Sequence, residues 1–420
     1  MLIYIPFIYF TLWLILHLVN PNNRFGAGAM ALLWVDLSAF FAILIDFRNL
    51  YGQFGCNSHA ISFIGIILYC ALWTIILYPL IRLDNNNIQI SSITIKPKLF
   101  RFLCVFLILC MIIHIGQLDL ATLKNQLLMD SSEAYSDKFE RAAYAGGAKQ
   151  YWMWVPNIVA SFTPLYPLFW FISITICKQP KWISILLLLF SLLSMIVGFS
   201  DGGRAALLWG IMTFLMYFFL FKHKLSSIQL KNITILFACI TCIALIGFTL
   251  ITISRFDDGA NNAIDSFIGY AGQPINNFCA FLPYTDFAHL YPERIFPLYQ
   301  YAVKHEALRL SDIYAVLSNI YPIQVNVFFT LFGELLMDTG VLGLLIFLVL
   351  YTWVTRTFLK GHSTLNIQHL FIIGIILCIL VRGLFAWPFT TYSDTLYLFF
   401  SLCLYLIFQY NITYGNKQLI

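Results

Sequence analysis

The feature that most constrains the fold of this chain is a series of apolar stretches that recurs from end to end. About 20 apolar residues cross a bilayer as a helix. Eleven stretches approach or reach that length, at residues 2–19, 29–45, 60–81, 99–116, 157–177, 182–199, 205–221, 233–253, 339–358, 367–386 and 395–412. Only 10% of the residues are charged, against about 25% in a typical soluble domain. The sequence therefore predicts a polytopic membrane protein.

The expected fold is all-α, with one integral membrane domain over residues 1–420 and about eleven transmembrane helices. The first stretch has no basic residues before it, as a signal peptide would, so we expect it to be a retained helix. Residues 326–337 are apolar but too short to cross a bilayer. They predict a half-helix or re-entrant piece, which is tolerated only when buried in protein, and they leave eleven and twelve helices both open.

The distribution of charge predicts the orientation. The odd-numbered loops and the C-terminus hold 13 basic residues and one acid, whereas the even-numbered loops hold 11 basic residues and 17 acids. Basic residues are in excess on the cytoplasmic side of membrane proteins. We therefore expect the odd-numbered loops inside and the N-terminus outside.

Two external loops are expected to be long, at residues 117–156 and 254–325. The first is polar, and the spacing of its leucines suggests an amphipathic helix at the interface. The second is divided by five prolines and is rich in Phe and Tyr. Connections of this length are usually functional or disordered, and the aromatic content favours order.

A break between two apolar stretches is the most distinctive local motif. Ser200-Asp201-Gly202-Gly203-Arg204 separates stretches six and seven at the outer face. Glycines let backbone N–H groups approach a ligand, and an arginine fork suits phosphate. The motif predicts that Asp201, Gly203 and Arg204 bind a lipid-linked phosphate or diphosphate; the alternative is a tight helical turn with an arginine that reaches the interface.

Arg255, which follows the eighth stretch, is a second candidate phosphate clamp. It precedes Asp257 and Asp258, so an interfacial cap paired with these acids is an equal alternative.

Two acids form a third candidate group. Glu334 and Asp338 lie four residues apart in Gly333-Glu334-Leu335-Leu336-Met337-Asp338-Thr339-Gly340, and would share one face of a helix. At membrane depth they should face a cavity rather than lipid, where one could accept a proton from an attacking hydroxyl. The alternative is a polar helix end.

The remaining candidates are basic. Lys304, His305 and Arg309 in the large loop could bind an anionic lipid head or a glycan, although a solvated helix face explains them better. Arg382, late in the tenth stretch, is a further candidate phosphate contact.

These motifs resemble a known family. Gly202-Gly203-Arg204-Ala205-Ala206-Leu207 resembles the small-Arg-small-small-Leu turn of the bacterial oligosaccharide repeat-unit polymerases, the Wzy proteins. The stretch from Leu331-Phe332-Gly333-Glu334 to Gly340-Val341-Leu342-Gly343 resembles their Glu-containing Gly-x-x-Gly segment at the end of the large periplasmic loop. The Arg-x10-Gly motifs of some members are absent, since Leu215 and Ser266 stand where the glycines would be.

The resemblance implies a GT-C type glycosyltransferase of the bacterial inner membrane, with its active site facing the periplasm. It would join undecaprenyl-diphosphate-linked repeat units into a surface polysaccharide such as O-antigen or capsule. No cofactor, nucleotide sugar or metal is implied. The expected partners are the lipid-linked oligosaccharide, membrane lipid and a Wzz-type chain-length regulator, and no nucleic acid.

The expected roles follow from this reaction. Arg204 and Arg255 would neutralise the leaving diphosphate, Glu334 would orient or deprotonate the acceptor hydroxyl, and the other candidates would contact substrate. A glycan ligase, a lipid-linked oligosaccharide flippase or transporter, and a structural membrane protein stay open. The related ligases carry a loop histidine before their Gly-x-x-Gly; the absence of histidine between His305 and Gly340 favours the polymerase.

Overall fold

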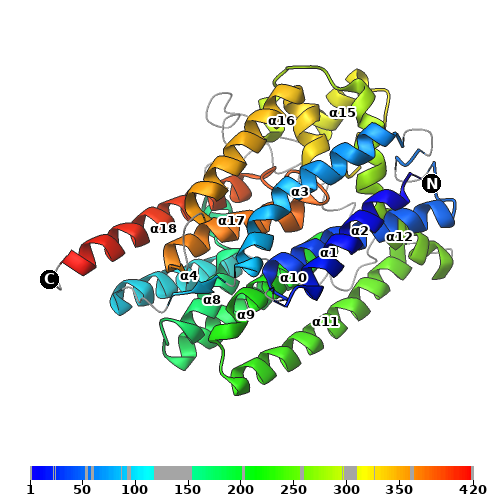
Figure 1. Cartoon of the computed structure of the whole chain (residues 1–420). Helices are drawn as coiled ribbons and strands as arrows, with labels where there is room; N and C mark the ends of the chain where they lie inside the picture. The colour runs from blue at the N-terminus through cyan, green and yellow to red at the C-terminus, as the bar shows by residue number, and fades with distance from the viewer. Residues whose placement is uncertain are drawn as a thin grey trace. The chain divides into compact units, whose positions relative to one another are not determined.

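In the part of the chain that the structure describes, the regular elements are helices apart from one pair of two-residue strands (Figure 1). The structure is a computed structural model, and its chain divides into two compact units, which are described separately. It describes residues 2–21, 23, 25–52, 55–57, 61–86, 88–91, 96–117, 154–200, 204–255, 260–295, 297, 310–325, 327–359 and 364–417.

Within the described residues, four helices contain segments long and apolar enough to cross a membrane: Ala27–Phe47, Phe63–Asn85, Pro97–Ile115 and Thr330–Leu359. Five more apolar helices or helix segments are shorter: Tyr4–Val19, Leu165–Thr175, Lys181–Met195, Ser227–Cys242 and Ile367–Gly383. The prediction of an all-α protein is thus confirmed, and the long apolar helices are consistent with a membrane protein. Eleven spans and the GT-C arrangement stay predictions.

The first unit comprises residues 1–88, 258–362 and 378–391. Its central helix α2 (Ala27–Phe47) packs against α1 (Tyr4–Val19), α3 (Phe63–Asn85) and α12 (Ala260–Phe281). Glycines allow two of these close approaches, because a Cβ at Gly28 would lie 2.6 Å from the Leu80 backbone and one at Gly272 would lie 2.5 Å from that of Phe41. The unit also contains η3 (Leu282–Tyr284), α13 (Pro292–Ile295), α15 (Leu310–Ile320) and α16 (Thr330–Leu359).

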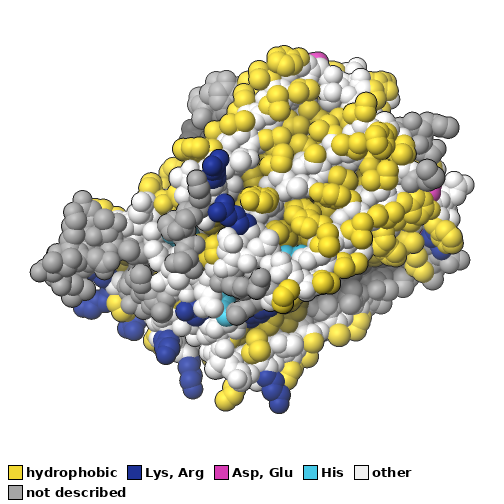
Figure 2. Space-filling model, viewed as in Figure 1, with side chains coloured by type: hydrophobic (Ala, Val, Ile, Leu, Met, Phe, Trp, Pro, Cys, Tyr) yellow, Lys and Arg dark blue, Asp and Glu magenta, His cyan; other side chains and the backbone are white. Residues whose placement is uncertain are grey.

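One side of α16 carries a stripe of large apolar side chains that are exposed. They recur at helical spacing, as expected for a face turned to lipid rather than water; they are Leu342, Leu345, Ile346, Val349, Leu350 and Trp353. In Figure 2 the surface over α3 and α16 is largely hydrophobic. This surface supports a membrane-embedded first unit.

The second unit comprises residues 89–257, 363–377 and 392–420. Strands β1 (Gln89–Ile90) and β2 (Thr364–Leu365) pair in parallel, with Gln89 opposite Thr364. The helices are α4 (Pro97–Gln117), α7 (Trp154–Ser161), α8 (Leu165–Thr175), α9 (Lys181–Ser200), α10 (Arg204–Phe221), η2 (Lys222–Lys224), α11 (Ser227–Arg255) and α18 (Tyr392–Lys417). Helix α17 (Ile367–Gly383) begins in this unit and ends in the first.

The core of the second unit is aromatic. Phe100 of α4 stacks on Phe169 of α8 with ring centroids 5.3 Å apart, and Phe171 of α8 stacks on Phe221 of α10 at the same separation. The Tyr166 hydroxyl donates to the Leu107 carbonyl over 3.1 Å. These contacts tie α8 to α4 and α10.

Two expected elements differ from the structure. The stretch at 157–177 forms two helices, α7 and α8, separated at residues 162–164. Pro164 explains the break, because it lacks the N–H of a continuous helix and its ring collides with the preceding turn. In addition, residues 260–281 of the expected large loop form a 22-residue helix, α12, which continues through Pro274. The other expected loop falls almost entirely on residues 118–153, outside the described residues.

Candidate functional site

A short buried helix at the start of α16 forms the core of the candidate site. Helix α16 contains a non-helical residue, Gly340, with φ 66° and ψ −169°. Every residue from Thr330 to Asp338 is buried. A helix that is buried on all sides lies inside protein. This is the environment predicted from the sequence for a half-helix before the ninth span. Residues 330–338 are called the half-helix below.

At the kink, the missing helical hydrogen bonds are replaced by a strap, defined as residues 286–291. In a continuous helix the N–H groups of Val341 and Leu342 would bond to carbonyls four residues earlier. Here they donate to the carbonyls of Asp286 (3.2 Å) and Phe287 (2.9 Å). The carbonyl of Asp338 accepts from the Tyr291 N–H at 2.7 Å. The strap therefore supplies hydrogen-bond partners for backbone groups that lose their helical partners at the kink.

Gly340 is required at this kink for two reasons. Its backbone conformation is essentially restricted to glycine. A Cβ there would also lie 3.0 Å from the carbonyl oxygens of both Asp286 and Phe287. The glycine thus permits both the change of direction and the close approach of the strap.

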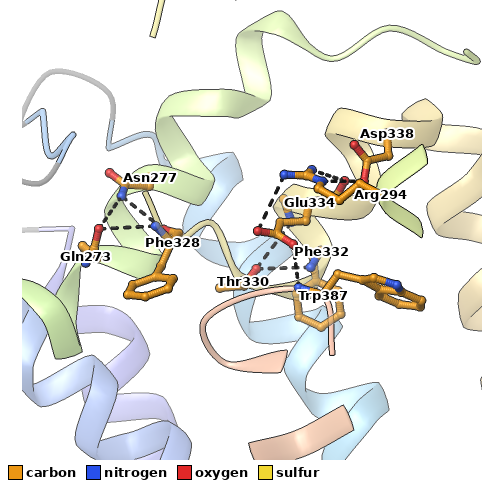
Figure 3. A network of polar contacts seen from close by, with 10 residues as sticks. Gln273, Asn277, Arg294, Phe328, Thr330, Phe332, Glu334, Asp338 and Trp387 are labelled. Atoms are coloured by element: carbon orange, nitrogen blue, oxygen red, sulfur yellow. Dashed lines mark hydrogen bonds and ion pairs between the residues drawn. The ribbon is translucent and has the colours of Figure 1, made fainter. Parts of the chain in front are cut away.

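Arg294, in α13, joins the two acids of the half-helix (Figure 3). Its Nε donates to Oδ2 of Asp338 over 2.8 Å, and its Nη1 lies 3.8 Å from Oε1 of Glu334. Its Nη2 also donates to the Glu334 carbonyl over 3.3 Å. The arginine side chain is only 1% exposed. Burial would lower the pKa of Arg294, but the charges of Asp338 and Glu334 outweigh it and raise this pKa well above its usual range.

Glu334 is held on its other side by backbone. Its Oε2 accepts the N–H of Trp387 over 2.7 Å, in the turn that follows α17. The Glu334 residue is 3% exposed. Its carboxylate therefore binds both the arginine of α13 and the turn after α17. In this way Glu334 fastens these two segments to the half-helix.

Tyr314 of α15 lies at the same cluster. Burial raises the pKa of its hydroxyl, and the charge of Glu334 raises it further. The neighbouring Tyr321 has a pKa of about 12, raised first by burial and then by the charge of Asp286. Both phenols therefore keep their protons around neutral pH.

A second polar group holds the chain immediately before the half-helix (Figure 3). On α12, Asn277 donates from Nδ2 to the Phe328 carbonyl over 3.1 Å, and Gln273 Oε1 accepts from the Phe328 N–H at 3.4 Å. Both amide residues are buried. The backbone that enters the half-helix is therefore paired by side chains from α12.

Of the candidates named from sequence, the structure brings Glu334 and Asp338 together around one arginine. Arg382 is half-buried, and its Nη1 donates to the Pro388 carbonyl over 3.5 Å. Arg204 is the first residue of α10 and Arg255 is the last residue of α11. The structure describes the backbone of these two residues but not their side chains. Asp201, Gly203, Lys304, His305 and Arg309 also lie outside the described residues.

Sequence reasoning missed Arg294, His289 and the Trp387 N–H. The one available signal was indirect: two buried acids require a cation, and Arg294 is one of the few basic residues of the large loop. Nothing in the sequence distinguished Arg294 from Lys304 or Arg309 as that cation.

The cluster is a buried network of paired charges. Among the described residues, no group of three or more His, Cys, Asp or Glu side chains could hold a metal ion. The buried charges connect α13, the half-helix and the turn after α17, and so fix part of the large loop against a membrane helix.

Comparison with known proteins gave no match to a protein family, a curated protein or a solved structure.

Proposed function

We propose that this chain is a membrane-embedded glycosyltransferase that joins lipid-linked oligosaccharide repeat units, an oligosaccharide repeat-unit polymerase. The motif resemblance around Arg204 and Glu334 supports it, as do the apolar helices.

The observation that carries the proposal is the position of Arg204. Helix α9 ends at Ser200 and α10 begins at Arg204, so the arginine stands at a helix N-terminus between two apolar helices. The backbone N–H groups of a helix N-terminus favour an anion. An arginine placed there adds a full positive charge and a fork for phosphate oxygens. A lipid-linked diphosphate is an anion that can bind at such a helix end in a membrane.

The proposed reaction transfers a glycan from a diphosphate. The acceptor hydroxyl oxygen attacks the anomeric carbon of the donor glycan, and the bond from that carbon to the diphosphate oxygen breaks. The hydroxyl proton passes to a base, and undecaprenyl diphosphate leaves with the bonding electron pair. Arg204, assisted by Arg255, neutralises the charge that develops on the leaving group.

Glu334 is engaged with Arg294 and the Trp387 N–H. In this arrangement its proposed part is positional: it fastens the loop helix α13 beside the half-helix. Acting as the base for the acceptor hydroxyl requires Glu334 to leave the Trp387 N–H and meet substrate.

The proposal places the enzyme in the bacterial inner membrane with its site toward the periplasm. The proposed substrate contacts are Asp201, Gly203, Lys304, His305, Arg309, Asp338 and Arg382, and a Wzz-type chain-length regulator is the proposed protein partner. No cofactor is proposed, because the diphosphate supplies the energy of transfer.

A reconstitution tests the reaction type. The purified protein is placed in liposomes with undecaprenyl-diphosphate-linked repeat units, without nucleotide sugar or added metal, and the glycans are separated on a gel. We expect a ladder of chain lengths. The absence of any transfer would contradict an enzyme and favour a transporter.

One observation favours a ligase as the second candidate. His289 of the strap contacts the half-helix through the Met337 carbonyl, at 2.8 Å, three residues before Gly340. A loop histidine therefore lies beside the Gly-x-x-Gly segment in space, although no histidine lies between His305 and Gly340 in sequence. A single product, formed only when a lipid A-core acceptor is supplied to the same liposomes, would favour the ligase.

A further inference from the structure

The strap is fastened to the half-helix by one histidine that uses both ring nitrogens. His289 Nδ1 contacts Oδ1 of Asp286, and His289 Nε2 lies 2.8 Å from the Met337 carbonyl oxygen. The His289 side chain is 14% exposed and that of Asp286 is 62% exposed, so solvent protons can reach the pair.

The kink explains why the Met337 carbonyl is available. In an unbroken helix it would accept from the Val341 N–H, but that N–H donates to the Asp286 carbonyl. The Met337 oxygen accepts from His289 and, at 3.4 Å, from the Tyr321 hydroxyl. A carbonyl near the C-terminal end of a helix also carries partial negative charge, which favours a cationic donor.

Counting protons shows what the two contacts of His289 require. A carbonyl oxygen only accepts, so Nε2 must carry a hydrogen. An ionised carboxylate also only accepts, so Nδ1 must carry one as well. Neutral histidine has one ring hydrogen. Both contacts, formed together, therefore require one proton more than neutral His289 and ionised Asp286 carry, on either the imidazole or the carboxyl.

Charged and titratable groups from the surrounding elements lie around the pair. From the half-helix, Glu334 and Asp338 contribute two carboxylates, and from α13 Arg294 contributes one guanidinium. From α15 Tyr321 keeps its proton, since its pKa is about 12. Within the strap, the Tyr291 ring lies 5.0 Å from the imidazole. Arg294, the other basic group among these neighbours, is already paired with Glu334 and Asp338.

We propose that Asp286 and His289 form a proton-dependent clamp that holds the strap against the kink at Gly340. With the extra proton, both hydrogen bonds of His289 form. Without the extra proton, one of these two hydrogen bonds is lost. The lost bond is either the one from His289 to the Met337 carbonyl or the one between His289 and Asp286 within the strap. The clamped state holds the proton, so it is favoured at low pH and weakens as pH rises. Histidine changes charge between about pH 5 and 8.

The clamp controls the covering of the kink. The strap supplies the acceptors for the Val341 and Leu342 N–H groups, so its release exposes them to solvent. This inference stands on the strap geometry alone and does not depend on glycan transfer.

Hydrogen exchange measures the clamp directly. The full-length protein in lipid nanodiscs is labelled from about pH 5.5 to about pH 8.5, with labelling times scaled to the intrinsic exchange rate, and peptides covering residues 340–343 are followed. Loss of a hydrogen bond to a charged group shifts an opening equilibrium by about tenfold or more. We therefore expect protection of these amides to fall about tenfold or more across the range.

Two substitutions at the pair separate a clamp from general pH sensitivity. In Asp286→Asn, the amide can donate to an unprotonated Nδ1 while Nε2 still donates to Met337, so both bonds form without the extra proton. We expect protection that is high and constant with pH. In His289→Gln the titrating group is gone, and protection should also be constant.

The matched control is Asp265→Asn, which removes an acid of α12 that pairs with Arg48 instead; it should keep the wild-type pH response. Constant protection in the wild-type protein, or an unchanged pH response in both Asp286→Asn and His289→Gln, would overturn the clamp.

Discussion

The Nε atom of Arg294 lies 2.8 Å from Oδ2 of Asp338, and both side chains are 1% exposed. The two residues come from different helices, α13 and α16. A charge pair buried this completely is costly to break, because each partner would leave the other unpaired in a low-dielectric interior. The pair therefore determines where α13, in the middle of the large loop, rests on the half-helix.

Replacing Arg294 should destabilise the first unit. In Arg294→Met the carboxylates of Glu334 and Asp338 stay buried without a cation, and removal of one partner of a buried pair costs about 3–5 kcal/mol. Thermal unfolding in detergent should show a clearly lower midpoint. Arg356→Met is the control, since Arg356 is exposed on α16, and its midpoint should stay close to wild type.

Removing the acids together with the arginine should restore much of that loss. The triple variant Arg294→Met, Glu334→Gln, Asp338→Leu leaves no buried charge at the cluster, and such replacements are often neutral or stabilising. A triple variant as unstable as Arg294→Met would show that lost packing, rather than unpaired charge, causes the effect.

Gly340→Ala should disturb the kink more than a comparable glycine substitution elsewhere. Gly340 has a backbone conformation that alanine rarely adopts, and its Cβ would press on the strap carbonyls. We expect a loss of about 3 kcal/mol. Gly52→Ala is the control, because Gly52 also has positive φ (90°) but nothing lies within 4 Å of its Cβ.

The Gly52→Ala variant should lose about 1–2 kcal/mol from backbone strain alone. Equal losses of unfolding free energy at the two positions would contradict a tight contact between Gly340 and the strap.

Glu334→Gln separates a positional role from a chemical one. Glutamine retains a side-chain oxygen that can accept the Trp387 N–H, but it loses the charge opposite Arg294 and cannot take a proton. If Glu334 only positions the loop, the loss of chain extension should match the loss of folded protein. A complete loss of extension in a variant with wild-type unfolding would instead identify Glu334 as the base.

Much of the helical layout could be predicted because apolar stretches of membrane length have few alternatives. The half-helix was also predictable, since residues 326–337 are apolar yet too short to cross. Helix α12 was missed because Asn261, Asn262, Gln273 and Asn277 interrupt its apolar pattern and Pro274 suggests a break. Its helical form depends on packing against α2, which no local pattern reports.

The candidate site was only half predictable. Glu334 and Asp338 could be placed on one face, because their spacing of four residues is a local property of a helix. Their cation lies 40 residues before Glu334 in a segment with several basic residues, and its choice depends on how that loop folds back. The role of His289 likewise depends on a carbonyl that becomes available only through the kink at Gly340.

We propose that Arg204 serves glycan transfer from a lipid diphosphate, and the most direct measurement follows both products at once. Reconstituted wild-type protein, Arg204→Lys and Arg204→Ala are compared for glycan extension and release of undecaprenyl diphosphate. We predict one diphosphate released per repeat unit added by wild type, and loss of both products in both variants, because lysine lacks the arginine fork. Wild-type extension by Arg204→Ala would contradict the claim.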